Sequence, residues 1–262
     1  MIKMVSHSYN QVLIMLMFIM YSCISIVLVI SIDNNRIVNS QINALRPTSL
    51  ASKAIPALTT EPPLKILLLV EPTPFNYISG YSNRFKEMLK YLKKANDDVV
   101  IISPDRTTYN KPPEITPPKE FLGYKIISPR GWEFPFYKQV TLTYDFKFNI
   151  PKVLKSFKPD LIHATTPSSV VIPAVIWSRL MNVPLVISYH TDLAGYANTS
   201  YIPRVARKYS VKLAYFLIRF FHKYADLALC TSPQLKEQMQ WLGLTRVDVW
   251  QKGINTEVCV FI

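Results

Sequence analysis

The chain has 262 residues, of which 30 are Lys or Arg and 17 are Asp or Glu, so its formal net charge is +13. Because 49% of the residues are hydrophobic, the chain carries too much apolar side chain to remain unfolded. Its three cysteines, Cys23, Cys230 and Cys259, are too few and too scattered for a disulfide scaffold. The length allows one large domain or two small ones.

The N-terminal segment is typical of a targeting sequence. Residues 12–32 form an almost unbroken apolar run, close to the ~20 residues of a membrane span and longer than the ~7–15 of a signal-peptide core. Residues 34–63 are rich in Ser, Thr, Asn and Ala with one acid, Glu61, as in transit peptides. Two interpretations of residues 1–63 stay open: a two-part leader for import into a plastid, or a membrane anchor of the secretory system followed by a stalk. Both exclude these residues from the folded domain.

From residue 64 onward, short apolar runs alternate with amphipathic segments. Strands are expected at residues 65–70, 98–104, 124–128, 160–165, 184–190, 226–231 and 246–250. Helices are expected at residues 84–95, 147–157, 168–181, 203–224 and 234–242. The proline-rich residues 104–119 and the aromatic-rich residues 132–145 are expected to be irregular. This alternation predicts a doubly wound α/β domain whose parallel sheet of about seven strands is covered on both faces.

Ligands of such sheets bind at the carboxyl ends of the strands, so the residues that follow the strands are the candidate site. Gly80 precedes a predicted helix, where its bare backbone would suit an anion such as phosphate, although an ordinary turn explains it equally. Thr165 and Thr166 end one strand and would either line the site or cap the next helix. His163, in the middle of that strand, is expected to be a hydrogen-bonded core residue.

His190 ends the next strand, where an imidazole can donate a hydrogen bond or move a proton at neutral pH. The sequence contains neither the glycine pattern of dinucleotide-binding folds nor a P-loop, and neither HExxH nor CxxC spacing. We therefore expect no metal site and no bound cofactor.

The helix expected at 203–224 is strongly basic. Its cations gather on one side, with an apolar arc beside them that is expected to pack on the sheet. A basic helix face suits an anionic bilayer or a nucleic acid, and the membrane-type leader favours the bilayer. The candidate membrane-contact residues are Arg204, Arg207, Lys208, Lys212, Arg219 and Lys223.

Three stretches together resemble a known family: PPLKILLLVEPTPFNYISGYSNRFKEMLKYLKK, FKPDLIHATTPSSVVIPAVIWSRLMNVPLVISYHTDL, and ADLALCTSPQLKEQMQWLG with VWQKGINTE. Residues 64–257 are similar to the amino-terminal domain of the sulfoquinovosyltransferases, the sulfolipid synthases of plants, algae and cyanobacteria. The resemblance implies half of a GT-B fold, which consists of two facing Rossmann-like domains. It also implies metal-independent transfer of sulfoquinovose from UDP-sulfoquinovose to diacylglycerol at a plastid membrane.

The resemblance also implies roles for particular residues. His190 would hydrogen-bond the transferred sugar as the catalytic residue, and the basic helix would contact the membrane. The residues that would line the donor and acceptor sites, or mark the crossover to the second domain, are Tyr77, Ser79, Gly80, Arg84, Thr165, Thr166, Thr191, Tyr196, Lys252 and Gly253.

In the family, the chain continues after KGINTE into a second domain that holds most of the donor, whereas residues 258–262 here read VCVFI. We therefore expect the 262-residue chain to be inactive by itself. Two alternatives to sulfolipid synthesis stay open. One is another GT-B transfer of a hexose or mannose to a lipid, and the other is a non-catalytic, membrane-associated protein that binds anionic lipid through the basic helix.

Overall fold

A computed structural model describes residues 62–75, 79–104, 118–129, 131–134, 137–143, 145, 147–197 and 204–251. The apolar run at 12–32 and most of the expected leader lie outside this part of the chain. Among the described residues, no helix combines the length and apolar character needed to cross a membrane.

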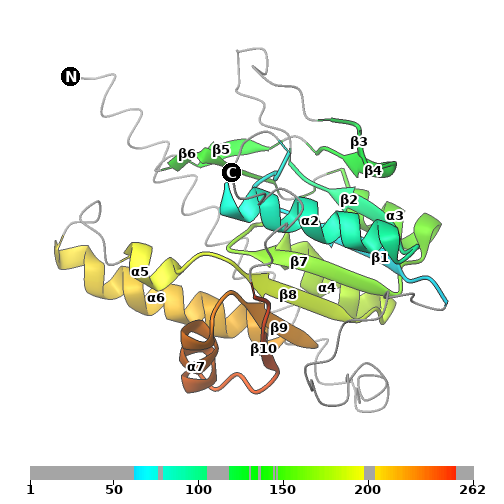
Figure 1. Cartoon of the computed structure of the whole chain (residues 1–262). Helices are drawn as coiled ribbons and strands as arrows, with labels where there is room; N and C mark the ends of the chain where they lie inside the picture. Colours follow the sequence, from blue (N-terminus) through cyan, green and yellow to red (C-terminus); the bar gives the residue numbers. More distant parts are fainter. Residues whose placement is uncertain are drawn as a thin grey trace, which may run out of the picture.

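One mixed sheet forms the centre of the domain (Figure 1). Its eight strands follow the order β10-β9-β8-β7-β1-β2-β4-β3, and all pairs are parallel except β3 with β4. The strands are β1 (Lys65–Leu69), β2 (Asp98–Ile102), β3 (Glu120–Phe121), β4 (Tyr124–Ile127), β7 (Leu161–Thr166), β8 (Leu185–Tyr189), β9 (Leu227–Cys230) and β10 (Val247–Val249). The helices are α2 (Gly80–Lys94), α3 (Asn149–Phe157), α4 (Val171–Met181), α5 (Leu193–Ala197), α6 (Arg204–Lys223) and α7 (Pro233–Trp241).

The predicted α/β class and every predicted strand and helix are confirmed, with shifted ends. Four elements were missed. The strands β5 (Trp132–Phe134) and β6 (Tyr137–Leu142) form an antiparallel hairpin in the segment expected to be irregular. The other two, β3 and α5, have two and five residues. Elements this short carry too few residues for a periodic pattern to be visible.

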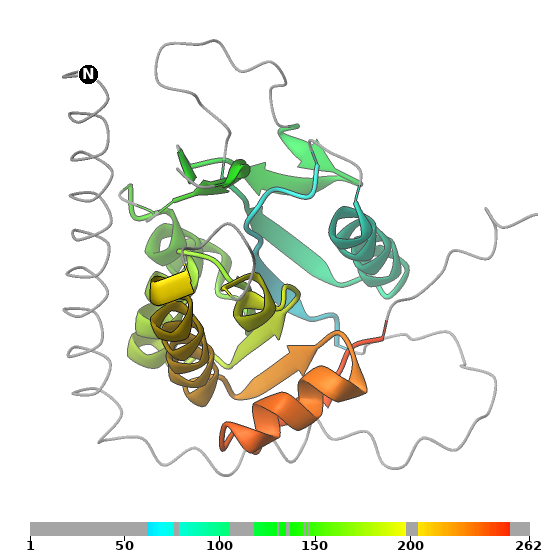
Figure 2. The same cartoon turned by 90° about the vertical axis from the view of Figure 1, so that its left-hand side faces the viewer.

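The two faces of the sheet are covered by different helices (Figure 2). Alternate residues of β1 point to opposite sides, so Ile66 and Leu68 pack with Phe85 and Leu89 of α2. Their neighbours Leu67 and Leu69 pack on the opposite face, in a core formed with α3, α4 and the end of α6. Both cores are fully shielded from water, so the positions of the strand ends are set by packing on both sides.

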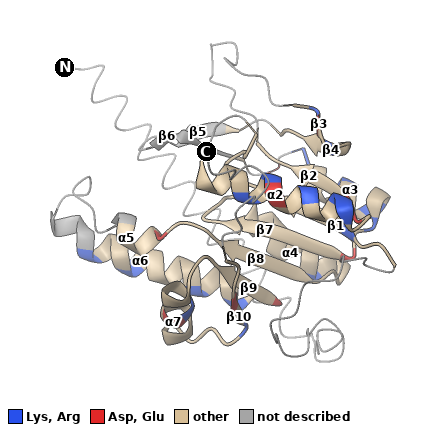
Figure 3. Cartoon of the chain, in the orientation of Figure 1, with Lys and Arg blue, Asp and Glu red and all other residues tan. Residues whose placement is uncertain are grey.

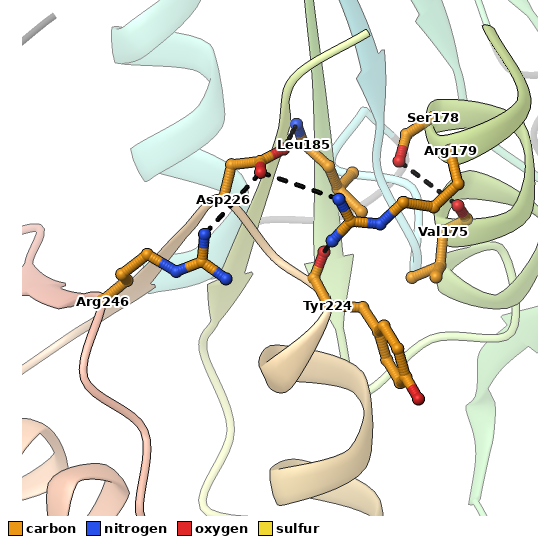
Figure 4. A network of polar contacts seen from close by, with 7 residues as sticks. All are labelled: Val175, Ser178, Arg179, Leu185, Tyr224, Asp226 and Arg246. Carbon is orange, nitrogen blue, oxygen red and sulfur yellow. Dashed lines mark hydrogen bonds and ion pairs between the residues drawn. The ribbon is translucent and has the colours of Figure 1, made fainter. Parts of the chain in front are cut away.

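A buried charge network joins α4 to the strands beside it (Figure 4). The guanidinium of Arg179 donates to the carbonyl of Tyr224 and lies 3.9 Å from Oδ1 of Asp226. The other carboxylate oxygen of Asp226 accepts from Leu185 N at 2.8 Å, and Arg246 approaches Oδ1 to 3.8 Å from the surface. Because buried charges are costly unless paired, this network fixes how α4, β8 and β9 meet.

The sheet has a switch point between β1 and β7. The chain leaves β1 through α2 toward β2, and it leaves β7 through α4 toward β8 on the other side. Consecutive connections therefore run in opposite directions, which opens a crevice beyond the carboxyl ends of these two strands. The candidate site lies there.

Candidate functional site

His190 stands at this edge of the sheet, directly after β8. Its ring meets the rings of Tyr81, Phe85 and Trp250 edge-on, with centroid distances of 5.2, 5.1 and 5.4 Å. Its Nε2 atom lies 2.9 Å from Oγ of Ser188, which is fully buried. Burial, together with the neighbouring His163 and Arg84, lowers the pKa of His190 to about 3. At neutral pH the ring is therefore uncharged and suited to hydrogen bonding with a neutral group such as a sugar hydroxyl.

His163 shares the environment of His190. It is buried on β7, its Nε2 lies 2.9 Å from Oγ of Ser188, and burial lowers its pKa to about 4. The expectation of a hydrogen-bonded core histidine is confirmed. The structure adds that its partner Ser188 also bonds His190, a link that sequence spacing did not reveal.

Arg84 of α2 brings a positive charge to the same crevice. Its Nη1 donates to the carbonyl of Trp250 at 2.9 Å, and its guanidinium carbon lies 5.3 Å from the centre of the Trp250 ring. Burial lowers the pKa of Arg84, but an arginine remains charged at neutral pH. Trp250 directly follows β10 and lies between Arg84 and the two histidines. No sequence pattern singled out this tryptophan.

The N-terminus of α2 opens at the switch point. Ser79 is its N-cap, with an extended backbone and a hydroxyl that accepts from Ser82 N at 3.0 Å. Gly80 is the first helical residue and is exposed. The helix therefore starts four residues earlier than expected, and the predicted glycine lies at its N-terminus, where a phosphate is favoured. Tyr77 lies outside the described residues.

Thr165 and Thr166 point to opposite faces of β7. Thr165 Oγ1 accepts from the backbone N of Glu71 at 3.0 Å and donates to its carbonyl at 3.1 Å. Thr166 Oγ1 donates to the carbonyl of Ser188 and lies 3.0 Å from Nε2 of His222 on α6. Neither caps α4, whose N-cap Val170 has no side-chain cap, so the capping alternative is wrong. Both hydroxyls brace the strand ends, and their contact with a ligand stays a prediction.

No sequence pattern singled out Glu71, the residue that organises this edge. It is 1% exposed, and its carboxylate accepts from Thr143 N at 2.7 Å, from Val170 N at 3.1 Å, and from both N and Oγ of Ser169. Burial outweighs these donors and raises the pKa of Glu71 from 4.5 to about 7. This side chain satisfies the backbone at the start of α4 and ties three chain segments together. The sequence feature that could have identified Glu71 is its position as an acidic residue directly after an apolar strand.

The other predicted site residues are only partly described. Thr191 follows His190 and is half-buried. Tyr196 belongs to the short helix α5, but its side chain lies outside the described part, as do Lys252 and Gly253 entirely. In the described residues there is no group of three or more His, Cys, Asp or Glu side chains that could hold a metal ion.

The basic helix α6 differs from expectation in how it packs. Lys208, Lys212, Arg219 and Lys223 are exposed. Figure 3 shows basic residues at several positions along α6. The side chains of Arg204 and Arg207 are not among those that the structure describes. The inward face consists of small or medium side chains: Ala214, Ile218 and His222 are buried.

The expectation that the apolar arc of α6 packs on the sheet is wrong for its central residues. Tyr209, Leu213 and Phe216 are 71%, 47% and 53% exposed. These three residues are spaced by four and three positions, so they share one face of the helix. That face lies beside the cations on the solvent side. The outer surface of α6 is therefore both basic and apolar.

Comparison with known proteins defines the class of this domain. The profile of glycosyltransferase family 4 matches residues 78–258, which include every strand of the sheet except β1, and the site residues from Ser79 to Trp250. The chain belongs to glycosyltransferase family 4, and its Rossmann-like α/β domain is that of a glycosyltransferase.

The chain is 36% identical over 198 residues to sulfoquinovosyl transferase SQD2 of Arabidopsis thaliana, covering 74% of this chain and 36% of the relative. It is 27% identical over 181 residues to a GDP-mannose-dependent alpha-mannosyltransferase of Mycobacterium tuberculosis, covering 69% of this chain and 45% of that one. The chain thus spans less than half the length of these relatives. A solved sucrose-phosphate synthase from Thermosynechococcus elongatus aligns at 17% identity with a TM-score of 0.38, over 74% of this chain and 92% of that chain.

Proposed function

We propose that this chain takes part in glycolipid synthesis, transferring sulfoquinovose from UDP-sulfoquinovose to diacylglycerol at a membrane surface, in a plastid. The observation that carries the proposal is the 36% identity to a sulfoquinovosyl transferase over 198 residues. The similarity to a mannosyltransferase is lower, at 27%. In the crevice, an uncharged histidine and a guanidinium both contact the ring of Trp250, a combination suited to a sugar with an anionic substituent.

In this proposal, His190 faces the transferred sugar and Arg84 adds positive charge to the same wall of the crevice. The N-terminus of α2 at Gly80 faces the diphosphate, since its backbone amides and dipole favour an anion. The transfer then depends on fixed dipoles and hydrogen bonds aimed at the developing charge on the diphosphate.

The outer surface of α6 supports a lipid acceptor. Exposed lysines and an arginine would attract anionic headgroups, and Tyr209, Leu213 and Phe216 would enter the boundary between headgroups and acyl chains. Diacylglycerol does not leave a bilayer freely, so an enzyme that uses it has to work at the membrane. The same surface would serve a non-catalytic lipid-binding protein, and only a transfer assay separates the two functions.

A transfer assay tests the proposal. Because the chain spans 36% of the length of the Arabidopsis relative, residues 64–257 are joined to the region of that relative beyond the aligned part. The chimera is given diacylglycerol vesicles with labelled UDP-sulfoquinovose, UDP-glucose or GDP-mannose, and the label in extracted lipid is counted. We expect label from UDP-sulfoquinovose only; label from GDP-mannose alone, or none from any donor, would reject the proposal.

A further inference from the structure

Two histidines of the crevice share one hydroxyl. Nε2 of His163 and Nε2 of His190 each lie 2.9 Å from Oγ of Ser188, a side chain with no exposure to solvent. His163 comes from β7, Ser188 belongs to β8, and His190 directly follows β8 two residues after Ser188. All three side chains therefore lie on the α2 face of the sheet.

A serine hydroxyl has one hydrogen and can donate it to one partner only. The alternative acceptor, the carbonyl of Ala164, lies at 3.5 Å, which is long for an O–H···O bond. If Ser188 donates to one imidazole, that ring has a bare Nε2, and the other ring must present Nε2–H to the oxygen. The two neutral rings then carry their protons on different nitrogens.

We propose that Ser188 and His163 are positioning residues for His190: their shared hydrogen bonds hold the two imidazoles in opposite tautomers and keep Nε2 of His190 turned into the domain. Among the described residues, Nδ1 of His190 has no hydrogen-bond partner. It is the nitrogen left for a ligand in the crevice.

The surroundings favour one fixed ring position. Tyr81, Phe85 and Trp250 contact the His190 ring edge-on, and the Trp250 ring also lies 5.8 Å from that of His163. Burial lowers the pKa of both histidines, to about 4 for His163 and about 3 for His190, so both stay neutral at physiological pH. A neutral ring can hold either tautomer, and the serine is the group that couples the tautomer of one ring to that of the other.

The consequence for catalysis rests on the proposed function, because it assumes that His190 faces the donor sugar. A ring held in one tautomer presents Nδ1 either always as a donor or always as an acceptor. The tautomer therefore determines whether a sugar hydroxyl at Nδ1 accepts or donates the hydrogen bond. The tautomer pairing itself does not depend on any transferase activity, so its test is independent of that assumption.

The test is 15N-imidazole NMR on the full chain at neutral pH. The sequence has four histidines, His7, His163, His190 and His222, and each signal is assigned by its His→Gln variant. We expect His163 and His190 to show opposite tautomers, one protonated at Nδ1 and the other at Nε2. The same tautomer in both rings, or a rapid average of both forms at either ring, overturns the proposal.

The Ser188→Ala variant tests the role of the hydroxyl. It should convert the His190 signal into an average of the two tautomers and leave the signal of His222, which bonds Thr166 on the opposite face, unchanged. The matched control is Ser178→Ala, an equally buried serine of α4 whose hydroxyl bonds Val175. Unchanged His163 and His190 signals in a folded Ser188→Ala protein would contradict the proposal, and changed ones in Ser178→Ala would do the same.

Discussion

Glu71 shows how one residue connects the fold to the site. Its carboxylate is the acceptor for the backbone at the start of α4 and for Thr143, and no described cation neutralises it. Because the folded state raises its pKa from 4.5 to about 7, the folded protein holds a proton that the unfolded chain has released over this pH range. By linkage, its contribution to stability is complete below about pH 4.5 and is lost as the pH rises through about 7.

Replacing Glu71 by Gln removes this proton. The free energy of unfolding of the wild type minus that of Glu71→Gln should therefore fall between pH 4.5 and pH 8, by an amount on the order of 3 kcal/mol. The measurement is urea denaturation of both chains across this range. The matched control is Glu87→Gln on α2, a half-buried acid that pairs with Lys90.

A difference that stays constant, or that grows with pH, would mean that the four donors outweigh burial and that Glu71 is a permanent carboxylate.

The buried histidines act in the opposite direction. Burial lowers the pKa of His163, His190 and His222 below 6.5, so their contribution to stability is present above that pH and is lost as the pH falls. Because both chains contain these histidines, their contribution cancels when the free energy of unfolding of the variant is subtracted from that of the wild type.

Among the elements, helix α6 is the one on which the hypothesis of membrane contact depends. Its inward face is narrow, with Ala214 and Ile218 at its centre, and the larger side chains Tyr209 and Phe216 are left on the outer side. Burying them would gain about 1.5–3 kcal/mol for each large apolar side chain, so their exposure in a folded domain calls for a partner. A bilayer satisfies both them and the neighbouring cations.

Charge reversal on α6 tests whether the cations of this helix, and not the net positive charge of the whole domain, cause binding to membranes. We expect Lys208→Glu, Lys212→Glu and Arg219→Glu together to lower binding of residues 64–262 to anionic vesicles by about tenfold or more, since each basic residue near the surface contributes about 1 kcal/mol. Flotation of vesicles with and without anionic lipid measures this. The control is the same charge change on α3 and its end, with Lys152→Glu, Lys155→Glu and Lys158→Glu, and it should bind like the wild type.

A second variant tests the apolar part of the same surface. Tyr209→Ser, Leu213→Ser and Phe216→Ser together should weaken binding to neutral vesicles, where charge contributes little. Retained binding in both the charge-reversed and the serine variants would show that α6 is not the lipid surface.

At the scale of the whole molecule, periodicity predicted the architecture because long apolar strands and amphipathic helices carry local signals. The runs around Leu67 and Ile187, and the helix around Phe85, were placed correctly. The hairpin β5–β6 and the short α5 were missed, since they depend on contacts rather than on a repeating pattern. The same reason explains the error on α6, whose inward face is set by the space beside the sheet.

The site was predicted only where a residue's place in the chain determines its place in the fold. Gly80 and His190 follow strands, so the rule for strand ends located them. Glu71, Ser188 and Trp250 were not singled out, because their importance comes from partners up to 166 residues away, such as Arg84 for Trp250. Such contacts are visible only in three dimensions.

In the function proposed above, this domain supplies the sugar-facing histidine of a sulfolipid-forming glycosyltransferase. The most direct measurement is kcat/KM for UDP-sulfoquinovose, with diacylglycerol vesicles, of the two-domain chimera and of its His190→Ala variant. We expect sulfolipid formation by the chimera and a loss of about 10²–10³-fold in the variant, the range for removal of one preorganised hydrogen-bonding group. Equal rates for the two proteins would contradict the claim.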